Sequence, residues 1–277
     1  MPTVIVGLGA QAAGDRIPEL QKGTIRMMKA ISDRCHSISV RGTFSAEVLN
    51  HYGVKNVTVT GCPSLLWHLK ESASVTRFPK SNKPWRVSLN ATVPAQMLDA
   101  KNNKHMQLAQ FMMQNALKKK CDIVMQTEAP FLRIKFGIAG EADWKLVEYV
   151  IGSKNRDQIR NYLNISLKCF GNVPEWLAYA ANRDMIIGTR LHGVVAGLLS
   201  GTPSVLITHD SRTEEMAKHA SIPSISSDEI QARGEINAQE LLERADFDAF
   251  NVRQRDYFKE FVKFFKDNEV ATFLNLT

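Results

Sequence analysis

Residues 184–203 read DMIIGTRLHGVVAGLLSGTP and contain a strand, a turn and a helix in succession. The apolar stretch 185–188 predicts a buried strand, and the small residues after the turn predict a helix that stops at Gly201. The turn itself holds Arg190 and His192. In α/β proteins, ligands bind at the carboxyl ends of the strands, where the N-termini of the following helices favour anions. The segment therefore predicts a site for an anionic substrate.

The overall composition is that of a folded protein with anionic partners. The length of 277 residues predicts one large or two small domains. With 44% apolar and 23% charged residues, the chain can bury a core. The formal charge of +7 suits nucleic acid, phosphorylated metabolites, acidic glycans or an anionic membrane surface. The basic residues are spread along the chain rather than gathered into one arm, so we do not expect a nucleic-acid binder.

The chain shows no targeting or metal-binding pattern. It has no run of about 18 apolar residues and no basic-then-apolar leader, so neither a transmembrane helix nor a signal peptide is predicted. The four cysteines lie far apart without metal-finger spacing, which is typical of a reducing compartment. The remaining histidines also lack ligand spacing, so we expect no metal site. These features predict a cytoplasmic protein.

Short apolar strands alternate with helices along the chain, which predicts mostly parallel sheets. A polar stretch with two prolines and several lysines separates two such blocks. We therefore expect an α/β fold of two Rossmann-like lobes. The N-terminal lobe would cover residues 1–75, a linker 76–84, and the C-terminal lobe 85–277. A cleft between two lobes is a common ligand site.

The expected elements follow from hydrophobic spacing and from helix start and stop residues. The N-terminal block has strands at 4–7, 37–40 and 57–60 and helices at 18–34 and 46–52. The C-terminal block has strands at 86–89, 123–126, 166–169, 185–188 and 204–208. Its helices are expected at 105–120, 141–150, 156–163, 173–181, 191–199 and 214–220.

The tail, residues 251–268, carries aromatic side chains at helical spacing and predicts an amphipathic C-terminal helix. Such a stripe usually packs on the protein's own core. The Lys and Arg residues of the tail leave a second interpretation open, a helix that lies on a membrane surface. In that case the protein would associate peripherally with the inner face of a membrane.

Two features of the N-terminal block lie at one predicted sheet edge. Gly7 and Gly9 fit a G-x-G-x-x-A pattern, which indicates either dinucleotide binding or a tight turn that needs glycine. Arg41 ends the strand at 37–40. Its guanidinium is either a fork for phosphate or carboxylate, or half of a surface ion pair.

Polar residues also follow two strands of the C-terminal block. Glu128 comes after the strand at 123–126 and is either a base or an exposed loop residue. His209, Asp210 and Arg212 follow the strand at 204–208, where Asp210 could instead cap the next helix. All of them would share the sheet edge of the 189–193 turn.

Within that turn the side chains are expected to divide between core and ligand. Leu191 should point into the core and fix the turn, which leaves Arg190 and His192 to face the ligand. A histidine beside an arginine at a strand–helix turn is a candidate for acid–base work.

Three segments at the ends of predicted strands carry a resemblance to a known family. They are Ser39-Val40-Arg41 with the helix after it, Arg190-Leu191-His192-Gly193 with Gly201-Thr202-Pro203, and Thr208-His209-Asp210-Ser211-Arg212. Together they resemble the polysaccharide pyruvyl transferase family, over about residues 4–223. Such enzymes are similar in architecture to two-lobed glycosyltransferases. They transfer the carboxyvinyl carbons of phosphoenolpyruvate to two sugar hydroxyls as a ketal and release phosphate.

The resemblance implies roles for the turn residues. Arg190 would clamp the anion and stabilise departing phosphate, and His192 would protonate the methylene carbon. Arg41 or Arg212 would hold the second anionic group. The other implied substrate-binding residues are Gly7, Gly9, Leu191, Gly193 and His209, and the candidates for the base are Glu128 and Asp210.

The resemblance also implies partners and a pathway. The donor is phosphoenolpyruvate, the acceptor is a sugar or a lipid-linked oligosaccharide, and no cofactor is required. The product would belong to exopolysaccharide or cell-wall glycan synthesis.

The sequence departs from the family pattern in three ways. Gly42 stands where the family has the Asp of SVRD, and Cys62-Pro63 stands where it has Asp-Pro. The chain also begins at what resembles an internal strand, so the N-terminal lobe is expected to be shortened. Two alternatives therefore stay open. One is a nucleotide-sugar glycosyltransferase of the same architecture, and the other is a catalytically degenerate module that binds a glycan or a partner.

Overall fold

The structure is a computed structural model that describes residues 3–10, 16–68, 74–76, 78–79, 85–94 and 103–274. It divides into two compact units. The first unit consists of Met1–Ser74, Thr208–Pro223 and Asp246–Thr277. The second unit consists of Val75–Ile207 and Ser224–Ala245.

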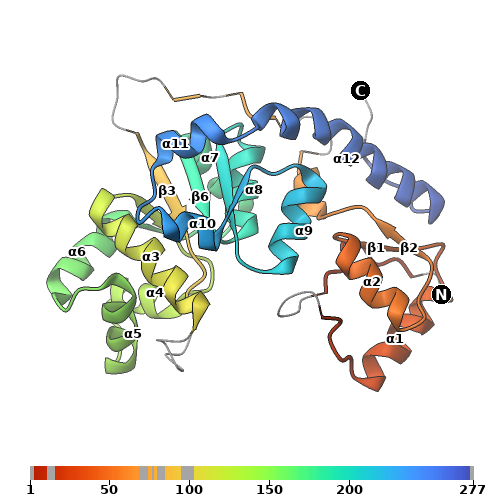
Figure 1. Cartoon of the computed structure of the whole chain (residues 1–277), viewed down its shortest axis with the longest axis horizontal. Coiled ribbons are helices and arrows are strands. Elements are labelled where there is room, and N and C mark those ends of the chain that lie inside the picture. Colours follow the sequence, from red (N-terminus) through yellow and green to blue (C-terminus); the bar gives the residue numbers. More distant parts are fainter. Residues whose placement is uncertain are drawn as a thin grey trace. The chain divides into compact units, whose positions relative to one another are not determined.

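Figure 1 labels the twelve α-helices of the described residues and the strands β1, β2, β3 and β6. The first unit holds α1 (Lys22–Ser32), β1 (Ile38–Val40), α2 (Thr43–His51), β2 (Val57–Val59), the 3-10 helix Pro63–Leu66, α9 (Ser211–Ala220) and α12 (Phe247–Asp267). The strands of the second unit are β3 (Val87–Asn90), β4 (Asp122–Val124), β5 (Leu167–Lys168), β6 (Met185–Gly188), β7 (Ser204–Thr208) and β8 (Ser224–Ser226). Its helices are α3 (Lys104–Lys119), α4 (Ala129–Lys135), α5 (Glu141–Ile151), α6 (Arg156–Ser166), α7 (Val173–Ala181), α8 (Leu191–Leu199), α10 (Ser227–Ala232) and α11 (Ala238–Arg244).

The second unit is built on a six-stranded sheet with the order β5-β4-β3-β6-β7-β8. The pairs β3–β4, β3–β6, β4–β5 and β6–β7 are parallel. This is the strand order of a doubly wound sheet, whose two halves diverge at the switch point between β3 and β6. The predicted α/β fold with mostly parallel strands is confirmed. The carboxyl ends of β3 and β6 mark the edge where ligands bind in such sheets.

Small residues let α8 pack closely on this sheet. Strands β6 and β7 are buried along their whole length, and every residue of α8 except His192 is buried. A Cβ atom at Gly197 would overlap the hydroxyl of Ser204 and lie 2.9 Å from Ile186. The glycine is therefore needed for the close approach of α8 to strands β6 and β7.

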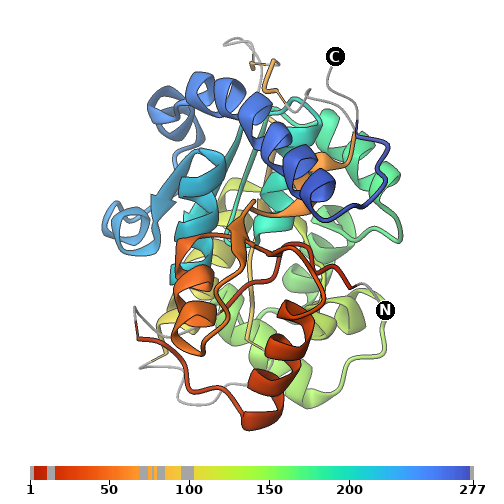
Figure 2. The ribbon, with the colours of Figure 1, turned by 90° about the vertical axis from the view of Figure 1, so that its right-hand side faces the viewer.

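In the first unit β1 and β2 pair in parallel, with Ile38 opposite Val57. The stretch 4–7 was predicted as a third strand. It runs beside β1, since Leu8 N–H donates to Ser39 O at 2.9 Å, but only Leu8 forms a bridge. Gly7 has φ +68°, a conformation that interrupts an extended strand and makes a turn instead. The unit also contains α2 and α9, which lie side by side (Figure 2).

The C-terminal helix α12 packs on the core of the first unit. Tyr257, Phe258, Phe261 and Phe264 are buried, as expected for a stripe that covers the protein's own core. The Tyr257 hydroxyl donates to Cys62 O at 2.8 Å. Among the described residues, no helix is both long enough and apolar enough to cross a membrane.

The units group the chain differently from the predicted lobes. Residues 208–223 and 246–277 were expected in the C-terminal lobe, but they group with the N-terminal residues because α12 packs on α9 and on the turn at Cys62. The expected linker, 76–84, lies mostly outside the described residues. At its start, Thr76 N–H donates to Gly201 O at 3.3 Å.

Most predicted elements agree with the structure within a few residues, and 173–181, 185–188, 191–199 and 204–208 match their bounds. The elements α4, α10, α11 and β8 were not predicted. Each has seven residues or fewer, which is too short for a hydrophobic period to be recognised. Helix α4 begins directly after Glu128, one of the predicted site residues.

Candidate active site

Arg190 follows β6 and lies at the switch point of the second unit. Its Nε donates to Glu128 Oε1 at 2.8 Å, and its Nη2 bonds the same oxygen and, at 2.6 Å, Thr127 Oγ1. The Glu128 residue is only 3% exposed. A buried carboxylate and a hydroxyl from the end of β4 therefore hold the guanidinium in one orientation.

Glu128 is occupied on both oxygens. While Oε1 binds Arg190, Oε2 accepts hydrogen bonds from Gln126 N at 2.9 Å and Thr127 N at 3.0 Å. The interpretation as an exposed loop residue is wrong, because the tight turn before α4 folds the side chain back over its own backbone. This bonding favours a positioning role for Glu128 over that of a base.

The ends of β3 and β6 are joined by polar contacts around Asn90. Arg190 N–H donates to Asn90 Oδ1 at 3.2 Å, and Thr189 N–H donates to Asn90 O at 2.9 Å. A Cβ atom at Gly188 or at Gly193 would overlap the Asn90 side-chain amide. Both glycines are thus required to make room for it. Asn90 was not among the predicted site residues, although a polar residue at the carboxyl end of an apolar strand is a signal that could have found it.

The first turn of α8 separates core and surface side chains as predicted. Leu191 is buried and His192 is exposed. Arg190 is the N-cap residue of α8, but its side chain makes no capping hydrogen bond. The positive end of the helix dipole is therefore not matched by its own N-cap side chain. The structure brings together Glu128, Arg190, Leu191, His192 and Gly193 at one edge of the second unit.

In the first unit Arg41 folds back on the glycine turn. Its Nε donates to Gly7 O at 2.8 Å, and a Cβ atom at Gly9 would lie 3.1 Å from Arg41 Cδ. Gly7 N–H in turn donates to the buried Ser39 hydroxyl at 2.8 Å. The geometry agrees with a tight turn that needs glycine at position 7, stabilised by the arginine.

The start of α2 is capped by a carboxylate from another helix. Glu215 of α9 accepts from Ser45 N at 3.1 Å and from Ser45 Oγ at 3.4 Å. The N-cap residue itself is Gly42, where a Cβ atom would overlap Glu215. Burial raises the pKa of Glu215, against the opposing effect of these hydrogen bonds. Glu215 was not found from the sequence, because nothing in the spacing of 42 and 215 indicates contact.

The residues after β7 lie at the start of α9, in the first unit. Asp210 is the N-cap of α9 and accepts from Thr213 N at 2.7 Å. Burial opposes ionisation, but the bonds from Thr213 keep the pKa of Asp210 below its ordinary value. The capping interpretation of Asp210 thus agrees with the structure. His209 precedes it, and Arg212 lies in the first turn of α9.

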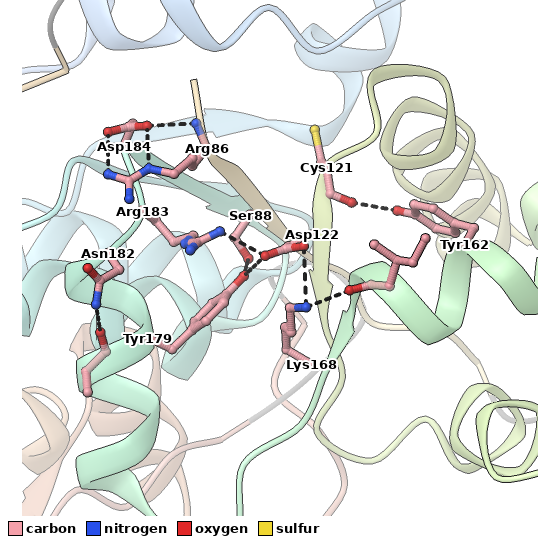
Figure 3. A network of polar contacts seen from close by, with 12 residues as sticks. Arg86, Ser88, Cys121, Asp122, Tyr162, Lys168, Tyr179, Asn182, Arg183 and Asp184 are labelled. Carbon is pink, nitrogen blue, oxygen red and sulfur yellow. Dashed lines mark hydrogen bonds and ion pairs between the residues drawn. The ribbon is translucent and has the colours of Figure 1, made fainter. Parts of the chain in front are cut away.

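A second polar network of the second unit lies at the opposite edge of the sheet (Figure 3). Asp122, at the start of β4, accepts from the Tyr179 hydroxyl and from Arg183 Nη1, each at 2.9 Å. Asp184, just before β6, binds Arg86 through a side-chain ion pair and through Arg86 N at 2.7 Å. Because these pairs join the amino ends of strands and match opposite charges, they stabilise the sheet rather than form the ligand edge.

Comparisons with known proteins bear on the family. The sequence model of the polysaccharide pyruvyl transferase family matches residues 1–211. A solved structure described as the glycotransferase of kitacinnamycin is similar over 87% of this chain and 62% of its own, with 13% sequence identity and a TM-score of 0.35. This chain thus spans less than two thirds of that structure. No curated protein matches the chain. The family match covers well over half of the sequence, including the turn after β1 in the first unit and the turn after β6 in the second unit. The chain belongs to the polysaccharide pyruvyl transferase family.

Proposed function

We propose that this protein transfers the pyruvyl group of phosphoenolpyruvate to a sugar as a ketal and releases phosphate. The enol carbon becomes electrophilic when the methylene carbon takes a proton. Two sugar hydroxyls then add to that carbon and the bond to phosphate breaks. Of the two hydroxyl protons, one replaces the proton given to the methylene carbon and the other leaves with phosphate, so that the reaction balances.

The donor would bind at the carboxyl edge of the second unit. Phosphoenolpyruvate carries a phosphate and a carboxylate, and this edge offers Arg190 and the N-terminus of α8. The buried Glu128 holds Arg190 in place before the ligand arrives, which reduces the entropy lost on binding. This preorganised arginine at the switch point is the observation that carries the proposal.

His192 would be the acid. It lies two residues after Arg190 on the first turn of α8 and is exposed, so a ligand bound at the helix end can reach it. An imidazolium group can give a proton to carbon at neutral pH and be restored by a sugar hydroxyl. Glu128 is not assigned as the base, because it is engaged by Arg190 and by its own turn.

The acceptor and the cellular setting follow the family. We propose a sugar or a lipid-linked oligosaccharide of exopolysaccharide or cell-wall glycan synthesis as the acceptor. We also propose a cytoplasmic location, with access to lipid-linked sugars at the inner face of a membrane.

The proposal is tested by measuring phosphate release from phosphoenolpyruvate with a panel of galactose- and mannose-type acceptors. We expect release that depends on the acceptor, and a ketal that mass spectrometry detects on the sugar. Thermal shift with phosphoenolpyruvate and with nucleoside diphosphates gives an independent measure of the donor class. Stabilisation by a nucleoside diphosphate alone would indicate a glycosyltransferase, and binding without turnover on any acceptor would indicate a degenerate binding module.

A further inference from the structure

Two buried amide nitrogens at the candidate active site have no hydrogen-bond partner among the described residues. They are Asn90 Nδ2 and Gln126 Nε2. Within the described part of the chain, one other buried side-chain nitrogen shares this property, Arg183 Nε, but its guanidinium lies 4.6 Å from the centre of the Tyr179 ring, over whose face it stacks. An unmet buried donor destabilises the folded protein, so two of them after neighbouring strands call for an explanation.

The orientation of the Asn90 amide is determined by its neighbours. The residue is only 1% exposed, and its Oδ1 accepts from Arg190 N–H. The Nδ2 group is therefore the one without a partner, and the position of a Cβ at Gly193 shows that it faces the first turn of α8. Two glycines are present where any side chain would displace this amide. The two glycines thus make space for the Asn90 amide, and its Nδ2 has no partner among the described residues.

Gln126 supplies a second unused donor from the neighbouring strand. Strands β3 and β4 pair directly, and Gln126 follows β4 by two residues. The next residue, Thr127, binds Arg190 through its hydroxyl. Asn90 therefore bonds the Arg190 backbone directly, and Gln126 is the chain neighbour of a residue that bonds the Arg190 guanidinium.

We propose that Asn90, with Gln126 two residues beyond the end of the neighbouring strand β4, binds an oxyanion of the substrate at the N-terminus of α8. This proposal rests on the proposed function, in which the oxyanion is the phosphate or the carboxylate of phosphoenolpyruvate. Such a group carries only acceptors, and therefore complements N–H donors and a positive helix end. Arg190 is already paired with Glu128. The neutral amide donors would therefore orient the bound anion through hydrogen bonds without adding charge to the site.

The test compares two buried asparagines in the full chain by calorimetric titration and thermal unfolding. Asn90→Asp keeps the shape and the oxygen that accepts from Arg190, but replaces the unused donor with an oxygen. Asn115 is the matched control, because it is 6% exposed and both of its amide atoms are bonded, Nδ2 to Phe111 O and Oδ1 to Ile236 N, each at 2.9 Å. The ligands are phosphoenolpyruvate, inorganic phosphate and pyruvate, of which the last two separate the phosphate from the carboxylate.

We expect Asn90→Asp to weaken phosphoenolpyruvate binding at least tenfold while the melting temperature of the free protein changes little. A carboxylate at the start of α8 suits the helix dipole and removes an unmet donor, but it repels an anion. Asn115→Asp should lower the melting temperature and leave the dissociation constant unchanged. Gln126→Leu should weaken binding by a smaller factor.

Each remaining outcome decides the inference. Unchanged phosphoenolpyruvate affinity in Asn90→Asp overturns it, as does a variant that only loses stability in the manner of Asn115→Asp. If the parent chain binds no oxyanion at all, the inference also fails. If the parent chain binds phosphate or a nucleoside diphosphate but not phosphoenolpyruvate, and Asn90→Asp loses that binding, the inference holds and the proposed function fails.

Discussion

The start of α2 and the start of α8 are built from the same parts in opposite ways. Each helix follows a parallel strand, each is preceded by an arginine, and a glutamate from another element reaches each turn. At α2 the glutamate, Glu215, binds the helix end and Arg41 bonds a backbone carbonyl. At α8 the glutamate, Glu128, binds the arginine, and the helix has no cap from its N-cap side chain.

The difference shows which of the two strand ends is suited to an anion. A carboxylate already satisfies the N–H groups at α2, and an incoming phosphate would have to displace it. At α8 the arginine is oriented, two nearby amide nitrogens have no partner among the described residues, and the Arg190 side chain makes no capping hydrogen bond. We therefore expect the donor of the reaction at α8, and expect α2 to contribute structure to its own unit.

The largest effect is expected for His192→Asn. Asparagine keeps some size and hydrogen bonding but cannot deliver a proton, so turnover should fall about a hundredfold or more while donor affinity is largely kept. The measurement is phosphate release under saturating donor, with binding followed separately. The control is His105→Asn, on α3 of the same unit, which should keep full turnover. A His192→Asn protein with most of its turnover would place the acid elsewhere, with His209 as the next candidate.

Next in size is the contrast between the two arginines. Lysine in place of Arg190 keeps one charge but loses the fork that binds Glu128 and Thr127, so phosphoenolpyruvate affinity should fall about tenfold or more. The matched change, Arg41→Lys, should alter affinity less than about twofold. Direct titration of both variants decides the point. Equal losses would mean that the first unit also binds the donor.

A smaller effect, on stability, is expected where Glu215 caps α2. Glu215→Ala should cost about 1 kcal/mol as the loss of a cap, and Gly42→Asp about 1–3 kcal/mol because the new side chain overlaps Glu215. In the double variant the carboxylate introduced at position 42 has room and can cap the helix itself, so the two costs should not add. Urea unfolding of the parent, the two single variants and the double variant measures the coupling. Costs that simply sum would show that Glu215 and position 42 do not compete for one place.

The smallest effect is a pH dependence of the same contact. Burial raises the pKa of Glu215 above its ordinary value of 4.5 in the folded protein. The folded state therefore holds the proton more tightly than the unfolded state, and this contribution to stability is full below 4.5 and is lost as pH rises through the raised pKa. The free energy of unfolding of the parent chain minus that of Glu215→Gln should accordingly fall as pH rises from about 4 toward neutrality. Glu214→Gln on the same helix provides the comparison, and a difference that rises with pH would contradict the assignment.

The agreement between sequence and structure is best where one physical pattern dominates. The strand 185–188 and helix 191–199 were predicted with their observed bounds because an apolar run, a turn and a glycine stop are all local signals. The stripe of α12 was recognised for the same reason. The stretch 4–7 was overpredicted, because a positive φ at Gly7 is a property of the folded turn and not of the apolar pattern.

The sequence by itself was sufficient to predict the alternation of strands and helices. It also placed Arg190, His192 and Gly193 in a turn between a strand and a helix. The spacing of apolar residues and the residues that start and stop helices act over a few positions, so the local sequence is enough to recognise them. Only the tertiary structure decided that Glu128 holds Arg190 across 62 positions, that Glu215 caps α2 across 170, and that Asn90 keeps an unused donor. Those contacts depend on which strands become neighbours and how closely helices pack on them, and no local pattern carries that information.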